Sequence, residues 1–340
     1  MDGLLTRAAE RMAAFASARD SFARARAALR ELAGWTLDRE SLRPLTHGTA
    51  RRRAAARPDR NDAARFARGG GFPSSPRRSP RPDRNDAARF ARGGGVVEVA
   101  IDAGQANAVG GWRDVTAAVV CKRTLGPPAS ADGWENRKVP APTVRAVVAS
   151  IEDSKAFADR VRAETDRLGA TTAADGTVPA DGAEWIWNLA GDVRPQAAGV
   201  LDFFHVAERI ADAATAIRPA GEHADGLFAG GRAAVRAGGK AGREGWIGAA
   251  FGVRPAGSDG EPLRAPAADI APHREHLGYA DRLVAGRSIG SGQVEGAIEQ
   301  LVNRRRKRTG GRWRAEHVGP LVEWIARVDS PDWHDIWTAA

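Results

Sequence analysis

The spacing of hydrophobic residues predicts a helical start of the chain, followed later by alternating strands and helices. In residues 4–33 apolar side chains recur every three or four positions, which predicts a helix that Gly34 ends. TLDRESLRPL, residues 36–45, predicts a second, short helix. Two helices across a tight turn are typical of a helix-turn-helix unit. Residues 1–50 are therefore a candidate DNA-binding region, although most such helical hairpins are structural.

From residue 96 onward the pattern changes to short apolar runs separated by turn residues. VVEVAID predicts a buried strand that ends at Asp102, and WRDVTAAVVCKRTL predicts a second strand after a glycine turn. Residues 143–168 carry apolar side chains at helical spacing and predict one long amphipathic helix. Two strand-to-helix units follow, one through Asp181 and one through Asp202, and Glu295 lies in the first turn of a later helix. This order predicts an α/β fold with a mixed sheet flanked by helices.

Two segments lack such a pattern. Residues 51–95 are mainly Arg, Gly, Pro and Ser, with 13 Arg against 4 Asp, and contain RPDRNDAARFARGGG twice, at 57–71 and 81–95. This composition predicts a disordered linker, and the identical copies indicate a recent duplication. Residues 219–285 are rich in Ala and Gly and predict a helical insertion in the α/β domain, which spans 96–340.

The composition narrows the classes of protein to which the chain can belong. A formal net charge of +9 and a pI of about 10.7 favour a polyanionic partner, most often nucleic acid. The single cysteine, Cys121, excludes an internal disulfide framework and a cysteine-rich zinc site. No signal-peptide pattern and no apolar run of membrane-spanning length is present, so we expect a cytoplasmic protein without membrane contact.

Three carboxylates occupy positions from which the fold can bring them together. Asp102 and Asp181 each follow a predicted strand, and Glu295 begins a helix. Carboxylate oxygens are suitable ligands for Mg²⁺ or Mn²⁺, and three carboxylates can hold two ions that activate a hydroxyl and stabilise a leaving oxygen. The chain offers no convincing Ser-His-Asp or Cys-His pattern instead. Each acid alone is weak evidence, because an Asp after a strand is most often a turn or cap residue.

Asp202 and His205 form a second candidate pair. They are three residues apart in LDFFHVAE, at the start of a predicted helix, and therefore share a face of it. In one interpretation Asp202 caps the helix and His205 bonds to a neighbour. In the other interpretation, His205 lies near the nucleic-acid strand that is cleaved, or it orients a catalytic carboxylate. The scattered histidines of the chain disfavour a zinc site.

A basic run follows the Glu295 helix. RRRKRTGGRWR contains seven basic residues and no acid. Arginine and lysine bind phosphates, and tryptophan can stack on a base; a solvated helix end, favoured by the helix dipole, is the alternative. The position directly behind Glu295 favours DNA. The candidate DNA-binding residues are Arg304, Arg305, Arg306, Lys307, Arg308, Arg312, Trp313 and Arg314.

Several of these segments together resemble the DDE transposases of bacterial insertion sequences, in particular the ISKra type, which is related to Mutator-like enzymes. The matching pieces are VAIDAGQ with GGWRDVTAAVV, ADGAEWIWNL, VLDFFHVAERI, and GRSIGSGQVEGAIEQLVNRRRKRTGGRW with a closing DWHDIW. They cover about residues 96–217 and 284–337 in the family's order, and ADGAEWI, DxxHxxE and GSGxVE are specific in combination.

The resemblance implies an RNase H-like fold that binds two Mg²⁺ (or Mn²⁺) ions and cuts and joins DNA. The partners would be the element ends and target DNA, bound by a homo-oligomer associated with the bacterial nucleoid. Carried over by motif, the catalytic and metal-binding triad is Asp102, Asp181 and Glu295. Asp202 and His205 match an accessory motif that follows the second catalytic Asp in related transposases. Asp202 is also the reserve candidate for that second Asp.

Two other functions stay open. Ala103 stands where the family commonly has Gly, and the Ala/Gly-rich segment and the duplication are consistent with a decayed, inactive copy that only binds DNA. An RNase H-like nuclease or resolvase that cuts DNA without joining it is the other alternative. A small-molecule enzyme is disfavoured, because GGRAAVRAGG at 230–239 lacks the strand that a dinucleotide-binding motif requires.

Overall fold

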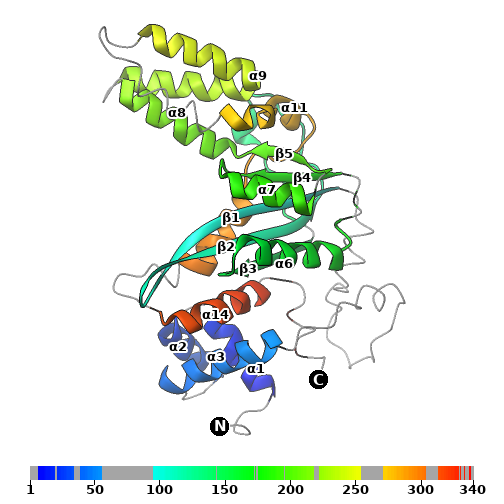
Figure 1. The fold of residues 1–340 in the computed structure, drawn as a ribbon, viewed down its shortest axis with the longest axis vertical. Coiled ribbons are helices and arrows are strands. Elements are labelled where there is room, and N and C mark those ends of the chain that lie inside the picture. The colour runs from blue at the N-terminus through cyan, green and yellow to red at the C-terminus, as the bar shows by residue number, and fades with distance from the viewer. Residues whose placement is uncertain are drawn as a thin grey trace.

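A computed structural model describes residues 7–19, 21–33, 39–55, 95–142, 144–171, 173, 175–194, 196–217, 222–253, 271–303, 313–328, 330, 333 and 337. Within these ranges the chain forms an α/β structure in which a five-stranded mixed sheet is flanked by helices (Figure 1). The coarse fold class predicted from the sequence is therefore confirmed. None of the helices in the described ranges has the length and apolarity needed to cross a bilayer.

The sheet has an antiparallel and a parallel half. Its strands lie in the order β3-β2-β1-β4-β5, with β2 antiparallel to both neighbours and with β1, β4 and β5 parallel. The strands are β1 Val96–Ala108, β2 Gly111–Arg123, β3 Val144–Ser150, β4 Gly176–Ala180 and β5 Ala198–Leu201. The helical elements are α1 Arg7–Arg19, α2 Phe22–Ala33, α3 Arg39–Ala55, η1 Trp134–Asn136, α6 Ser154–Arg167, α7 Glu184–Val193, α8 Phe203–Ile217, α9 Glu222–Val253, η2 Ala271–His276, α11 Tyr279–Val284, α12 Gly292–Ile298, η3 Glu299–Asn303 and α14 Ala315–Val328.

The alternation of side chains along β1 decides which helices cover each face of the sheet. Val97, Val99 and Ile101 point to one side, where they share a buried cluster with α6 and α7. Ala100 and Ala106 point to the other side and share a cluster with α12, η3 and α14. The strand is apolar on both faces because both faces are covered.

The helices outside these two layers gather at opposite ends of the molecule (Figure 1). At one end α1, α2 and α3 pack together and against α14. At the other end α8, α9 and α11 form a separate cluster around Phe203 and Tyr279, which extends from the end of β5. The hydroxyl of Tyr279 donates to the carbonyl of Leu201 at 2.9 Å, so this cluster is fastened to the sheet.

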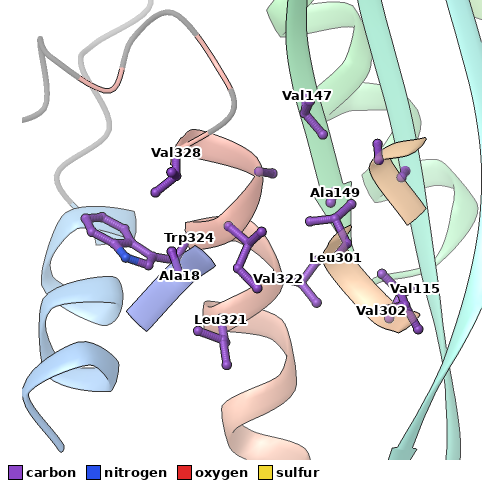
Figure 2. Packing of buried hydrophobic residues seen from close by; sticks show 14 of the residues in the cluster. Ala18, Val115, Val147, Ala149, Leu301, Val302, Leu321, Val322, Trp324 and Val328 are labelled. Carbon is purple, nitrogen blue, oxygen red and sulfur yellow. The ribbon is translucent and has the colours of Figure 1, made fainter. Parts of the chain in front are cut away.

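Three tryptophans close the core between the N-terminal helices and α14. The rings of Trp324 and Trp333 have centroids 5.1 Å apart, and those of Trp333 and Trp337 are 5.8 Å apart. Figure 2 shows Trp324 on the side of α14 that faces Ala18 of α1. Its indole nitrogen lies 3.4 Å from the carbonyl oxygen of Ala14, to which it donates.

The glycine-rich element α9 consists of two helices folded back on each other. Gly239, with φ 51° and ψ −124°, interrupts the helix, and Trp246 Nε1 in the second half donates to the carbonyl of Leu227 in the first at 3.0 Å. A Cβ at Gly231 would lie 2.8 Å from the ring of Trp246, and one at Gly242 would collide with the backbone of the first half. Glycine is required wherever the two halves touch this closely. The predicted helical insertion is thus helical in its described parts.

The structure corrects the prediction of one helix over residues 4–33. α1 ends at Arg19 and α2 begins at Phe22. The new helix begins because the Ser21 hydroxyl accepts a hydrogen bond from the amide of Arg24 at 3.3 Å, as an N-cap does. α3 is longer than predicted and includes residues 51–55. The rest of the predicted linker, apart from Gly95, lies outside the described residues, and the helix-turn-helix assignment stays a prediction.

The predicted helix over residues 143–168 is wrong in its first part. Val144–Ser150 forms β3, and the helix begins only at Ser154, where the Asp153 carboxylate accepts from the amide of Ala156 at 2.9 Å. Valines spaced by three and four fit a helix as well as a strand. Pairing of this segment with β2 along its whole length, together with the preference of valine for strands, decides in favour of the strand.

β1 does not end at Asp102, as predicted, but continues to Ala108. β2 pairs with it over the full length, and α12 and η3 cover the buried side chains of its second half. Pairing with β4 stops at Ile101, and pairing of β2 with β3 stops at Thr116. Residues 102–115 therefore project beyond the other strands as a hairpin, which we call the hairpin arm. The two predicted strand-to-helix units are confirmed as β4–α7 and β5–α8.

Candidate functional site

Three aspartates stand at one level of the parallel half of the sheet. Ile101 of β1 pairs with Ala180 of β4, and Ala180 pairs with the last residue of β5. The next residue in each strand's sequence is an aspartate: Asp102, Asp181 and Asp202. The amide of Asp202 donates to the carbonyl of Ala180 at 2.7 Å, so the alignment continues past the strands. The register thus brings together acids that lie far apart in the sequence.

Glu295 comes to the same region on α12, in the first turn of the helix as predicted. α12 approaches β1 so closely that a Cβ on Gly104 would lie 2.9 Å from Cγ2 of Ile298. By alternation, Asp102 lies on the same face of β1 as Gly104, which is the face that α12 covers. Asp102 and Glu295 therefore belong to the same side of the sheet.

The carboxylates of this region influence one another's ionisation. Burial, and then the negative charges of Asp181, Glu295 and Asp202, raise the pKa of Asp102 to about 6. Burial, and then the charge of Asp202, also raise the pKa of Glu295, against the effect of a hydrogen bond from Ser291. The acids therefore share a partly buried region with an excess of negative charge.

This donor set has the chemistry of a divalent-cation site. Carboxylate oxygens suit Mg²⁺ and Mn²⁺, and a cation would offset the repulsion that raises the pKa of Asp102. As they stand, no three His, Cys, Asp or Glu side chains among the described residues are grouped closely enough to hold one ion. The fit of a divalent cation to this region therefore rests on the negative charge of the carboxylates and on their oxygen donors.

Asp202 is fastened inside the protein. It is 2% exposed, and its carboxylate accepts four hydrogen bonds. Oδ1 accepts from the amides of Phe204 at 2.6 Å and His205 at 3.0 Å, which caps α8. Oδ2 accepts from the amide of Ser291 and from its hydroxyl, the latter at 2.6 Å. The capping interpretation of Asp202 is confirmed, and the same carboxylate ties β5 to the start of α12.

Ser291 connects Asp202 to Glu295. Its hydroxyl oxygen lies 2.6 Å from Oδ2 of Asp202 and 3.1 Å from Oε1 of Glu295, and its single proton is donated to one of these carboxylates at a time. A Cβ on Gly290 would lie 3.3 Å from Oδ2 of Asp202 and 3.2 Å from the ring of Phe204. In the GSG of the sequence motif, the hydroxyl of Ser291 thus orients Glu295, and the absence of a side chain at Gly290 leaves space for Asp202 and Phe204.

A second anchor, which was not predicted from the sequence, holds the same loop. Glu98, near the start of β1, is 3% exposed and accepts from Arg123 Nε at 2.9 Å. It also accepts from the hydroxyl of Ser288, whose carbonyl accepts from Arg282 Nε at 2.8 Å. A glutamate inside a buried apolar strand needs such partners, and this was the signal in VVEVAID. Glu98 and Asp202 together fix the loop before Glu295 at two points.

Aromatic side chains hold the loop that carries Asp181. Its Oδ1 accepts from the amide of Ala183 at 2.9 Å, and its carbonyl accepts from Trp187 Nε1 at 2.9 Å. The indole of Trp187 stacks on His276, with ring centroids 4.3 Å apart and planes 7° apart. His273 Nε2 lies 3.0 Å from the next carbonyl oxygen of the loop. Scattered histidines gave no sequence signal for this role.

The remaining predicted site residues are placed only in part. His205 is half-buried in the first turn of α8, and the role of its ring stays a prediction. Arg304–Arg308 and Arg312 lie outside the described residues. Trp313 is half-buried and packs against two core clusters, and Arg314 is exposed. Stacking of Trp313 on DNA stays a prediction.

Comparison with known proteins adds no relative: the sequence matches no protein-family model, and none of the curated proteins matches it closely enough to indicate kinship.

Proposed function

We propose that this protein is a DDE-type DNA transposase that cuts and joins DNA with two divalent cations. One observation carries the proposal: three aspartates share a level of the parallel strands, and two of them, Asp102 and Asp202, interact electrostatically with Glu295 on α12. The strand order β3-β2-β1-β4-β5, with β2 antiparallel to its neighbours, supports an RNase H-like fold. The motif resemblance of the sequence supplies the reaction class, because a fold alone does not define one.

Asp102, Asp181 and Glu295 would hold the ions, either Mg²⁺ or Mn²⁺. When bound, two such ions activate the attacking hydroxyl and stabilise the leaving oxygen of a phosphodiester. The protein contributes placement: Ser291 orients Glu295, and Trp187 holds the loop of Asp181.

Asp181 is favoured over Asp202 as the second metal-binding aspartate. Asp202 is 2% exposed and its carboxylate accepts four hydrogen bonds, so it has little capacity left for a cation. Asp181 is more exposed, and its carboxylate accepts a hydrogen bond from the amide of Ala183. Asp202 would then act as a positioning residue for Glu295, through Ser291.

The basic residues after α12 and the net charge of +9 favour DNA as the substrate. Water would first cleave a strand at the element end, and the freed 3′-hydroxyl would then attack target DNA at the same site. A homo-oligomer would hold both element ends, in the bacterial cytoplasm at the nucleoid.

A strand-transfer assay tests this function, with DNA ends taken from the inverted repeats expected beside the gene and with Mg²⁺ present. The unmodified protein should cut and join these ends. Asp102→Asn, Asp181→Asn and Glu295→Gln should each lower activity by more than about 100-fold. This exceeds the loss that is typical when a residue that only orients a metal ligand is replaced. Asp225→Asn, an exposed change on α9, serves as the control and should keep activity. Full activity of Asp102→Asn and Glu295→Gln would show the triad to be wrong.

Two outcomes would replace the proposal by an alternative from the sequence. Salt-dependent binding to the repeats without cleavage would identify an inactive, DNA-binding copy. Cut products that are never joined would identify a nuclease or resolvase.

A further inference from the structure

The hairpin arm ends in two exposed apolar side chains. Val109 is 56% exposed and Trp112 is 57% exposed. The opposite face of the arm is well covered, since Ala106 and Ala108 are buried against α12 and η3. A large indole in water at the end of a projecting hairpin contributes little to the fold. It is available for contact with another molecule.

The tip of the hairpin arm, residues 107–112, is held in place by backbone hydrogen bonds to another segment of the chain. Gly110 and Gly111, with φ 95° and 123°, permit the tight turn. Trp313 pairs with the tip from outside: its amide donates to the carbonyl of Asn107 at 3.1 Å, and the amide of Val109 donates to its carbonyl at 2.6 Å. Asn107 is also the strand partner of Trp112. The indole of Trp112 is therefore presented from a backbone held on both sides.

Two exposed arginines stand close to the tip in the sequence. Arg113 is exposed and follows Trp112 in β2, with its side chain on the other face of the strand. Arg314 is exposed and follows Trp313. Two acids are exposed in the same segments, Asp114 and Glu316. Asp114 accepts a hydrogen bond from Gln105 Nε2 at 3.1 Å, which holds its side chain within the arm. An exposed indole flanked by arginines is the combination that stacks on a base while binding the adjacent phosphates.

We infer that the tip of the hairpin arm is a DNA-contact site, in which Trp112 stacks on an unpaired base and Arg113 and Arg314 bind the flanking phosphates. The inference rests on the proposed function for its choice of DNA as the partner. A protein interface is disfavoured, because a stable one buries about 800 Å² on each partner, whereas the apolar surface here is one indole and one valine.

The arm also places this contact relative to the carboxylates. Val109, which follows the end of β1, is seven residue steps from Asp102, which is about 23 Å at the usual rise of a strand. That length corresponds to about seven nucleotide steps. The contact would therefore lie on the same DNA molecule as the reacting phosphate, well away from the metal-binding acids.

Fluorescence anisotropy with a labelled single strand of about 30 nucleotides, and with the matching duplex, tests the site. The protein carries Glu295→Gln and the buffer contains EDTA, so that no catalysis is needed. Trp112→Ala should weaken binding to the single strand by about 5- to 150-fold and Trp112→Phe much less, because stacking needs only an aromatic face. Arg113→Ala should lower the slope of log K against log salt by about 0.7. Val284→Ala, an equally exposed change on α11 at the far end of the molecule, is the control.

An unchanged affinity of Trp112→Ala for the single strand, with an unchanged melting temperature, would overturn the inference. So would a loss confined to the duplex. A change in sedimentation of Trp112→Ala with DNA affinity intact would show a contact between copies of the chain instead. The proposed function fails separately: a Trp112-dependent affinity combined with no strand transfer by the unmodified protein would leave the contact site standing.

Discussion

Asp102→Asn should stabilise the folded protein at neutral pH. The folded state raises the pKa of Asp102 from 3.8 to about 6, so the folded state binds this proton more tightly than the unfolded chain does. Stability associated with the group is then fully present below pH 4 and is lost as the pH rises through 6. Two pKa units correspond to about 3 kcal/mol. Partial exposure of the side chain reduces this to about 1–3 kcal/mol.

The assay is urea denaturation of both proteins between pH 4 and pH 8 without divalent cations. Asparagine keeps an oxygen that can accept the hydrogen bond from the amide of Ala103, now 2.6 Å from Oδ1. The gain of Asp102→Asn should therefore be small at pH 4 and reach its full value above pH 7. Asp225→Asn on α9 is the matched control and should change stability by less than about 0.5 kcal/mol at every pH. A gain that does not depend on pH, or a loss at pH 8, would refute the argument that burial, together with the neighbouring negative charges, raises this pKa.

Three further predictions use the same measurements of stability. Saturating Mg²⁺ should stabilise the unmodified protein by about 2.7 kcal/mol at 100 times the dissociation constant, and Asp102→Asn should lose most of this effect; an equal response of both proteins would place the ion elsewhere. Asp202→Asn should cost about 1–3 kcal/mol, because an amide group would face the donors of Ser291, and Ser291→Ala should cost about 0.5–1.5 kcal/mol; the reverse order would contradict the network described. Gly239→Ala should cost about 1–3 kcal/mol, since φ 51° with ψ −124° suits only glycine, whereas Gly245→Ala, with open space around it, should stabilise α9 by up to about 1 kcal/mol. Similar effects of the two alanines would show that Gly239 carries no conformational constraint.

The sequence was sufficient to find the carboxylates because each stands where a short apolar run meets a turn or a helix start. Asp181, Asp202 and Glu295 were placed correctly on their elements for this reason. That three aspartates share one level was not predictable, because strand register depends on pairing across the sheet and not on local spacing.

The errors and omissions have similar causes. Valines at 144, 147 and 148 satisfy a helical and a strand pattern equally, and only the partner strand decides between them. The extension of β1 beyond Asp102 depends on α12 and η3, which cover it from nearly 200 residues away in the sequence. The Ala/Gly-rich composition suggested decay, yet Gly231, Gly239 and Gly242 are required by the fold of α9. These three glycines of α9 are therefore explained by close packing of its two halves and not by decay of the sequence.

The contact between the two ends of the chain has a consequence for the order of folding during synthesis. Ala14 accepts a hydrogen bond from Trp324, 310 residues later, and the same cluster buries Ala18 beside Trp333 and Trp337. A ribosome adding 5–20 residues each second needs about 15–60 s to cover that separation. During this interval α1 and α3 can form their small apolar cluster with α2, but α14 and its tryptophans are not yet present to bury their other apolar faces. α1 and α3 are thus made long before α14 but are completed only when it packs on them, and a release from the ribosome before Trp324 would leave their apolar faces open to aggregation.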